Sequence, residues 1–294
     1  MLFNHIAIVG VGLIGGSFAL AARRAGLFNR ITGWGNRRDS LERACAAGVI
    51  DGVEEAFDSG SVSDADLIYL AAPVGGIIDF LRKRAHSIKP GAIVTDAGST
   101  KREICRAARE SLPEDIHFIG GHPMTGSHES GLEFADPDLF QGATYALMID
   151  GRREDLNSGQ SEAGDFVVEM VKALGGFPVL TTPDLHDRAV ARISHLPQLL
   201  STALAAAVAK SSSTEDGRLA GPGFSDMTRL AASRWAVWED ICRTNADEIA
   251  CALAEMVREM EVMRFALESK EHEKLRDAFR AANEFLHFFY RMRQ

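Results

Sequence analysis

The sequence contains few cysteines, and their spacing suggests neither disulfides nor a metal site. The chain has four, at Cys45, Cys105, Cys242 and Cys251, with no CxxC pair and no cysteine–histidine spacing typical of zinc. Each lies in a helical-looking segment, where a buried thiol acts as a small hydrophobe. We therefore expect reduced thiols, no bound metal and a cytoplasmic protein.

The chain also lacks an excess of positive charge. Lys and Arg total 32 against 41 Asp and Glu, which gives a formal net charge of −9. A surface that binds nucleic acid or an anionic membrane needs a net basic face. We therefore expect neither partner, and an anionic small-molecule substrate would need cationic residues concentrated at its site.

Long hydrophobic runs are missing as well. The run "LPQLLSTALAAAVA" stops at Lys210, short of the roughly 18 residues that a membrane helix needs. The first residues, "MLFNHIAIVGVGLIGG", lead directly into a strand and a glycine turn, without the basic stretch and cleavage site of a signal peptide. Both observations support the cytoplasmic expectation.

Strand-like and helical segments alternate over residues 5–150. Apolar runs such as "HIAIVG", "DLIYLAAP" and "AIVTDAGS" are separated by helical segments such as "SLERACAAG". This alternation predicts a mainly parallel sheet covered by helices on both faces. After a polar connection at residues 151–164, one helix and the strand "FPVLTT" complete a Rossmann-type α/β domain at residues 1–182.

From Pro183 onward we predict helices only. Thr182 is a candidate N-cap with Pro183 in the first turn. Two late helices carry apolar seams that step by four and three residues: Ile249, Leu253, Met256, Met260, Met263 and Leu267, then Leu275, Phe279, Ala282, Leu286 and Phe289. Such seams form either a bundle core or a subunit interface. We expect an all-helical substrate and dimerisation domain at residues 183–294.

A GxGxxG motif lies between the first strand and the first helix. Gly10 permits the tight turn, Gly12 lets the backbone approach a pyrophosphate, and Gly15 allows close packing of helix and strand. A second strand at residues 31–34 favours dinucleotide binding over a glycine turn without a ligand. The other expected cofactor contacts near these turns are Leu13, Ile14, Ala72 and Pro73.

The end of the second strand favours NADP over NAD. NAD enzymes usually carry an acidic residue there for the ribose 2′-hydroxyl, but this chain has Gly35, followed by Asn36, Arg37 and Arg38. An arginine can pair with a 2′-phosphate. The alternative is an ordinary solvated basic turn.

The stretch "GGHPMTGSHESG" follows a predicted strand and offers a candidate base. Pro123 biases His122 toward extended torsions at the strand's tip, on the edge where open α/β sheets bind ligands. A neutral histidine there can accept a proton, as removal of a hydride from a carbinol requires. A structural histidine is the alternative interpretation.

The stretch "VTDAGSTKREI" ends the preceding strand. Thr100 and Glu103 fit a capping box, which leaves Ser99 outside the helix and facing the same edge. There Ser99 could bond His122, the reacting hydroxyl or the cofactor. Plain capping and solvation is the alternative for Ser99 and Lys101.

Five motifs occur in an order typical of one enzyme family. They are "GVGLIGGS", "DAGSTK", "GGHPMTGSHESG", "ISHLPQ" and "GFSDMTRLAAS" followed by "WED", and they extend from about residue 5 to residue 285. Together they resemble the prephenate and arogenate dehydrogenases of tyrosine biosynthesis, a branch of aromatic amino acid biosynthesis. The resemblance implies a homodimeric oxidoreductase with a 6-phosphogluconate-dehydrogenase-like architecture.

The implied reaction is an oxidative decarboxylation with hydride transfer to NAD(P)+, which converts prephenate to 4-hydroxyphenylpyruvate and/or arogenate to tyrosine. The family's catalytic histidine and its partner serine fall on His122 and Ser99. The arginine that receives a substrate carboxylate falls on Arg229, a role that suits a guanidinium fork. The family's aspartate and tryptophan fall on Asp187 and Trp238.

Three positions depart from the family's pattern and leave the choice between prephenate and arogenate open. Gln198 replaces a histidine of many members and would share a helix face with His195 and Asp187. His128 stands where some members carry an acidic residue, and Ser225 where some carry a lysine. We expect all these residues to contact or tune the substrate.

Two other functions remain as alternatives. A β-hydroxyacid dehydrogenase or imine reductase would place a catalytic residue, often a lysine, on the long helix, but no lysine lies between Lys172 and Lys210. A non-enzymatic NADP-binding sensor would not need Ser99, His122 and Arg229 together.

Overall fold

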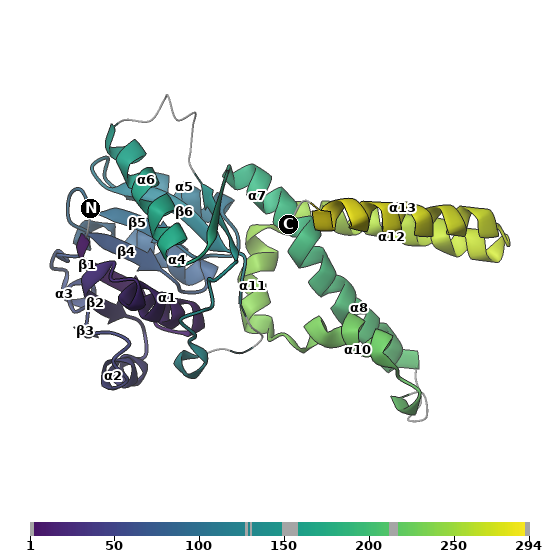
Figure 1. Cartoon of the computed structure of the whole chain (residues 1–294), viewed down its shortest axis with the longest axis horizontal. Coiled ribbons are helices and arrows are strands. Elements are labelled where there is room, and N and C mark those ends of the chain that lie inside the picture. Colours follow the sequence, from purple (N-terminus) through teal and green to yellow (C-terminus); the bar gives the residue numbers. More distant parts are fainter. Residues whose placement is uncertain (1–2, 127–128, 130, 149–157, 212–216, 292–294) are drawn as a thin grey trace. The chain divides into compact units, whose positions relative to one another are not determined.

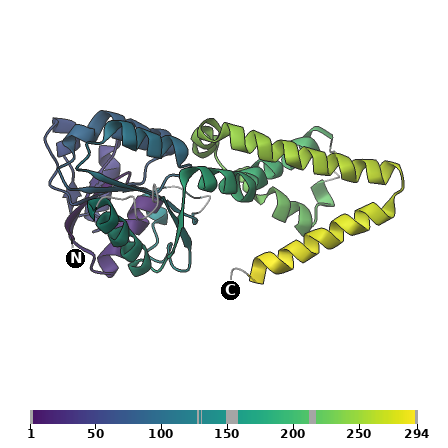
Figure 2. The same ribbon diagram turned by 90° about the horizontal axis from the view of Figure 1, so that it is seen from above.

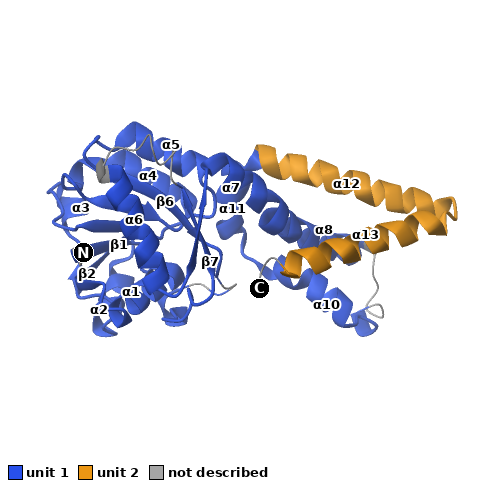
Figure 3. Cartoon of the chain, turned by 45° about the horizontal axis from the view of Figure 1, so that its top comes forward, with its two compact units in different colours: residues 1–246 blue, residues 247–294 orange. Residues whose placement is uncertain are grey.

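The computed structural model describes residues 3–126, 129, 131–148, 158–211 and 217–291. They form two compact units, residues 1–246 and 247–294 (Figure 3). Within the described ranges, no helix is both long enough and apolar enough to cross a membrane.

An eight-stranded sheet forms the centre of the first unit, in the order β3-β2-β1-β4-β5-β6-β7-β8 (Figure 1). Its strands are β1 (Phe3–Val9), β2 (Phe28–Trp34), β3 (Gly52–Val53), β4 (Leu67–Leu70), β5 (Ile93–Asp96), β6 (His117–Pro123), β7 (Thr144–Met148) and β8 (Phe177–Thr181). All neighbours pair in parallel except β6 and β7, which are antiparallel. The predicted mainly parallel sheet is confirmed.

Helices cover both faces of this sheet, as Figure 1 shows. They are α1 (Leu13–Arg24), α2 (Arg38–Ala46), α3 (Ala56–Ser59), α4 (Val74–Arg84), α5 (Arg102–Ser111) and α6 (Ser158–Ala173). Ile6 and Ile8 of β1 join one hydrophobic core, whereas Ala7 and Val9 join the other. Successive strand residues point to opposite faces, so a continuous apolar run is what a strand buried on both sides requires.

After β8, the described residues contain helices and turns but no strand. The elements are α7 (Pro183–Val190), a π-helical turn (Ala191–His195), α8 (Leu196–Ser211), α10 (Pro222–Thr228), a 3-10 turn (Arg229–Ala232) and α11 (Trp235–Thr244). Thr182 caps α7 as predicted, because its Oγ1 accepts the amide of Leu185 at 3.3 Å and Pro183 occupies the first turn. The wide π-helical turn precedes Pro197, which lacks the N–H that a regular α-helix would use.

The second unit is a helical hairpin of α12 (Ala246–Glu268) and α13 (His272–Arg291), seen in Figure 2. Lys270 turns the chain between the helices with a φ of 57°, in the left-handed region. The predicted seam residues Leu253, Met260, Met263 and Leu267 are exposed. Their side chains are therefore available to another surface.

The boundary between the compact units is not the boundary between the mixed and the all-helical parts of the chain. The compact units divide at residue 246, whereas the change from mixed strands and helices to helices alone follows β8. The predicted domain boundary at residue 182 therefore stays a prediction.

The four cysteines lie in helices and are free. Cys105 of α5 is buried, as a small hydrophobe would be, but Cys251 of α12 is exposed. The expectation of burial is therefore wrong for Cys251, because a helical setting does not determine which face of the helix is covered.

Candidate active site

The glycine motif forms a sharp turn between β1 and α1. Gly10 has a φ of 94°, and a Cβ added there would lie 2.9 Å from the backbone of Ala71. A Cβ on Gly15 would lie 2.1 Å from the carbonyl oxygen of Gly10. Gly12 is the N-cap of α1 and has open space beside it. An anion could therefore approach the helix N-terminus at Gly12.

A cavity of about 680 Å³ opens beside this turn, at the carboxyl ends of β1, β2 and β4. Six of the predicted cofactor contacts line it: Gly10, Gly12, Asn36, Arg37, Ala72 and Pro73. The other five, which are not among its lining residues, are Leu13, Ile14, Gly15, Arg38 and Ser99. The size and position of the cavity fit a dinucleotide, since such ligands bind at the carboxyl edge of an open α/β sheet.

The two arginines after β2 have different surroundings. Arg38 lies 2.7 Å from Glu55 and 3.6 Å from Glu42, and these carboxylates raise the pKa of its guanidinium. Arg37 lines the cavity. Lys83 and Arg84, at the end of α4, also line the cavity. Sequence reasoning missed them, because in the sequence they form only the basic end of a helix.

The strand β6 holds His122 through a buried network at Gly121. The amide of Gly121 donates to Asp96 Oδ1 at 3.0 Å, and its carbonyl accepts from Lys101 Nζ at 2.7 Å. Lys101 also forms a fully buried ion pair with Asp96. Sequence reasoning offered only capping or solvation for Lys101. The solvated role is wrong for Lys101, because its ammonium is fully buried and is paired with the carboxylate of Asp96.

His122 belongs to a chain of hydrogen bonds that sequence reasoning did not find. Its Nδ1 lies 2.9 Å from Nε2 of His186, and Nδ1 of His186 lies 2.7 Å from Oδ1 of Asp187. His186 and Asp187 are buried on α7. The adjacent pair "HD" was visible in the sequence, but the link to a strand 64 residues away was not.

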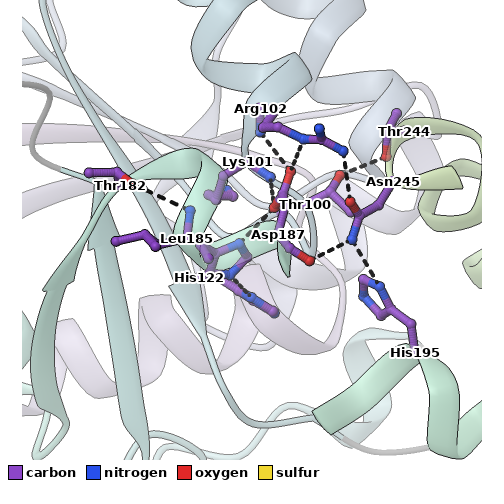
Figure 4. Close-up of polar contacts among 12 residues, drawn as sticks. Thr100, Lys101, Arg102, His122, Thr182, Leu185, Asp187, His195, Thr244 and Asn245 are labelled. Atoms are coloured by element: carbon purple, nitrogen blue, oxygen red, sulfur yellow. Dashed lines mark hydrogen bonds and ion pairs between the residues drawn. The ribbon is translucent and has the colours of Figure 1, made fainter. Parts of the chain in front are cut away.

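Asp187 also holds the start of α5 (Figure 4). Its carboxylate accepts the amides of Lys101 at 2.7 Å and Arg102 at 2.9 Å. These contacts replace the predicted capping box, which is wrong. Thr100 Oγ1 bonds Thr244 Oγ1 at 2.7 Å instead, and α5 begins at Arg102 with no side-chain cap from its own segment.

The surroundings of His122 and His195 favour the neutral form of both imidazoles. Burial is the main cause that places the pKa of His122 well below its usual range, and the electrostatic effects of His186, Lys101 and His195 act in the same direction. Burial also lowers the pKa of His195 to about 4, although Asp187 opposes the shift. Burial alone would raise the pKa of Asp187, but hydrogen bonds from His186 and the α5 amides outweigh it and lower that pKa.

Three of the predicted substrate residues are linked through contacts near Asn245. Asp187 and His195 contact Asn245 itself, and Trp238 contacts His195. The amide nitrogen of Asn245 lies 2.8 Å from the carbonyl oxygen of Asp187 and 3.3 Å from Nδ1 of His195 (Figure 4). The ring of Trp238 meets His195 edge to face at 5.8 Å. Asn245 is fully buried. No motif in the sequence marked this asparagine.

Gln198 makes contacts of a different kind. Its Nε2 donates to the carbonyl of Leu230 at 2.8 Å, and its Oε1 accepts from Ser233 Oγ at 3.2 Å. The amide thus binds α8 to Leu230 of the turn that carries Arg229 and to Ser233 directly after that turn.

The remaining predicted residues are placed as follows. Arg229 and Ser225 are exposed, Ser99 is half-buried beside Thr100, and His128 lies outside the described residues. Among the contacts of the described chain, Nδ1 of His122 shares a hydrogen bond with Nε2 of His186 and not with Ser99. The role of Ser99 stays a prediction.

One cluster of potential metal ligands lies elsewhere in the described structure. Donor atoms of His5, Glu54 and Asp64 lie within 4.8 Å of one another. The ring of His5 already meets Thr32 Oγ1 at 2.8 Å through Nε2 and Asp64 Oδ1 at 2.7 Å through Nδ1. Thr32 therefore accounts for Nε2, whereas Nδ1 lies at ion-pair distance from Asp64 without a hydrogen bond to it.

Two family models match the chain. Residues 18–171 match the nucleotide-binding domain of prephenate dehydrogenase, and residues 182–281 match its dimerization domain. A prephenate dehydrogenase of Bacillus subtilis is 34% identical over 285 residues, which cover 96% of this chain and 75% of that relative.

Solved structures are similar over the same extent. Prephenate dehydrogenase from A. aeolicus, in complex with hydroxyphenyl propionate and NAD+, has a TM-score of 0.85 at 27% identity and matches 95% of this chain and 96% of its own. Arogenate dehydrogenase from Synechocystis has a TM-score of 0.78 at 27% identity, with 95% and 97% covered.

Proposed function

The chain belongs to the prephenate dehydrogenase family, and we propose that His122 serves as the base in its oxidative decarboxylation of prephenate or arogenate. The observation that carries this assignment is the position and environment of the imidazole. It lies at the end of strand β6, next to the last residue Pro123 and toward the carboxyl edge of the sheet, and its lowered pKa keeps it unprotonated. An unprotonated imidazole is ready to accept the proton of a ring hydroxyl.

The proposed reaction divides the work between the chain and its cofactor. His122 takes the hydroxyl proton as the ring carbon is oxidised and carbon dioxide leaves. A bound nicotinamide would accept the hydride. The cavity residues Gly12 and Arg37 would hold the phosphates of the dinucleotide, since one lies at a helix N-terminus and the other brings a guanidinium.

We also propose the substrate contacts from charge. A dianionic or zwitterionic ring acid needs a local cation on a chain of net charge −9. Arg229 is exposed and near the network of Gln198, so its guanidinium is available to a carboxylate. Trp238 and His195 would face the ring, and Ser225 and His128 would tune the choice of substrate.

The cofactor preference is proposed as NADP. Gly35 leaves no carboxylate at the end of β2 to repel a 2′-phosphate, and Arg37 is among the residues that line the cavity beside it. NAD remains the competing cofactor in the test.

The quaternary structure is proposed as a homodimer. Its contact surface would be the apolar seams of α12 and α13, whose exposed residues include Met263, Leu267 and Phe279. Together with the predicted boundary at residue 182, this assigns residues 183–294 to substrate binding and dimerisation.

The test is a turnover assay of the purified protein with prephenate and arogenate, each with NAD+ and NADP+. We expect reduced nicotinamide and carbon dioxide in equal amounts with at least one pair. His122→Asn should lose at least about a hundredfold in kcat and keep cofactor binding. Absence of turnover with all four pairs would overturn the proposal, and loss of cofactor binding would make His122 structural.

A further inference from the structure

We infer that His186 is a positioning residue, which together with Asp187 fixes the tautomer of His122 so that Nε2 of His122 is the atom that accepts the proton. The inference rests on the proposed role of His122 as a base. It adds a residue, His186, that contacts the base through a 2.9 Å hydrogen bond.

Asp187 forms the buried end of this chain of hydrogen bonds. A carboxylate accepts hydrogen bonds and donates none. Asp187 stays ionised because its pKa is lowered: hydrogen bonds from His186 and from two α5 amides outweigh burial, which alone would raise it. Nδ1 of His186, which lies 2.7 Å from Asp187 Oδ1, must therefore carry the hydrogen of that contact.

The hydrogen on Nδ1 of His186 also determines the contact between His186 and His122. A neutral imidazole with hydrogen on Nδ1 has a lone pair on Nε2. With His186 in this neutral form, its Nε2 accepts and Nδ1 of His122 donates across 2.9 Å. His122 is then left with a lone pair on Nε2, the form that a general base needs.

The arrangement also fixes the direction of the His122 ring. Asp187 is completely buried and is held by the amides of Lys101 and Arg102, so the chain of bonds ends on the backbone of α5. His186 is 4% exposed and cannot turn without leaving Asp187. The charged or titratable groups around His122 come from three other elements: His186 from α7, Lys101 from the start of α5 and His195 from the π-helical turn.

The O–H bond of the substrate breaks and an N–H bond forms at Nε2 of His122, while the hydrogen on Nδ1 stays in place. The new imidazolium keeps its hydrogen bond to His186 and is favoured by the negative charge of Asp187 beyond it. An aspartate that orients and stabilises a catalytic histidine in this way is known from hydrolase triads, where it does not itself become protonated.

The test measures the tautomer directly by NMR of the full-length protein labelled with 15N-histidine. His122→Asn identifies the signals of His122 by their loss. For the unliganded wild type near neutral pH, we expect hydrogen on Nδ1 and none on Nε2 of His122. Hydrogen on Nε2 would overturn the inference. This measurement needs no substrate, so it decides the inference even where turnover of prephenate and arogenate fails.

Substitution of His186 adds a functional measurement. His186→Leu removes the acceptor, and we expect both tautomers of His122 to appear, with kcat reduced at least about tenfold and KM nearly unchanged. His186→Gln can offer its carbonyl to His122 and its amide to Asp187, so it should restore the Nδ1–H form and much of the kcat. His117→Leu, at the opposite end of β6, is the matched control.

The outcomes separate a positioning role from a structural one. An unchanged tautomer and an unchanged kcat in His186→Leu would overturn the inference. Equal loss of kcat in the Leu and Gln variants, with the tautomer of His122 unchanged in both, would do the same. If His186→Leu fails to fold, the tautomer of His122 in the wild type and the tautomer and kcat of His186→Gln still test the inference.

Discussion

At the scale of single residues, surroundings separate side chains that look alike in the sequence. Arg37 and Arg38 are neighbours, yet Arg37 lines the cavity and Arg38 pairs with Glu55 at 2.7 Å. Sequence reasoning gave both the same role, because a basic turn does not indicate which of its arginines borders the cavity. Because only Arg37 of the two borders the cavity, we expect these arginines to differ in their effect on the use of NADP+.

We expect Arg37→Ala to lower kcat/KM with NADP+ about tenfold or more, since an arginine–phosphate contact is worth on the order of 1.5–3 kcal/mol. The value with NAD+ should change little. Arg38→Ala is the matched control and should leave the NADP+ to NAD+ ratio near that of the wild type. An equal loss with both cofactors would contradict the assignment of Arg37 to the 2′-phosphate.

The buried His195 makes stability depend on pH. Its pKa falls from 6.5 to about 4 in the folded chain, so the unfolded state binds the proton first as pH drops. The stabilising contribution is therefore present above pH 6.5 and is lost as pH falls toward 4.

We expect the free energy of unfolding, measured by urea denaturation, to fall over this interval by on the order of 2 kcal/mol from His195. His195→Gln, which does not titrate, should flatten this part of the profile. His117→Gln is the control and should keep the wild-type slope. An identical slope in His195→Gln and wild type would refute the contribution.

At the scale of elements, contacts between distant segments replace local signals. The capping box predicted at Thr100 and Glu103 is absent because Asp187, 85 residues from Arg102, supplies the acceptor for the α5 amides. The Thr182 cap was predictable, since its partner Leu185 lies in the same segment. The spacing of a local cap is visible in the sequence, but a distant carboxylate that takes its place is not.

Gln198 provides a prediction for an element, the turn Arg229–Ala232. We expect Gln198→Leu to raise KM several-fold with a smaller effect on kcat, because it breaks the 2.8 Å contact that holds this turn to α8. Thr202→Val is the control, since it leaves the bond to Leu230 intact. Combination with Arg229→Ala should add little to KM if the two act through the same turn. Fully additive effects would contradict that coupling.

At the scale of the whole molecule, the exposed seam of α12 leads to a prediction about assembly. We expect Met263→Glu with Leu267→Glu to convert a dimer to a monomer in analytical ultracentrifugation, because two charges would be buried in an apolar contact. Arg258→Glu, an exposed change on the opposite side of the helix from the seam, is the control. A dimer that survives the double substitution would exclude the seam as the interface.

The sequence by itself determined the parallel sheet, the glycine turn, the helices after Thr182 and the family, because strand periodicity, glycine geometry and caps act over a few residues. Only the tertiary structure brought His122, His186 and Asp187 into one chain of hydrogen bonds and paired Lys101 with Asp96. These contacts join segments far apart along the chain, and their geometry depends on how β6, α5 and α7 pack. A linear pattern contains no record of that packing.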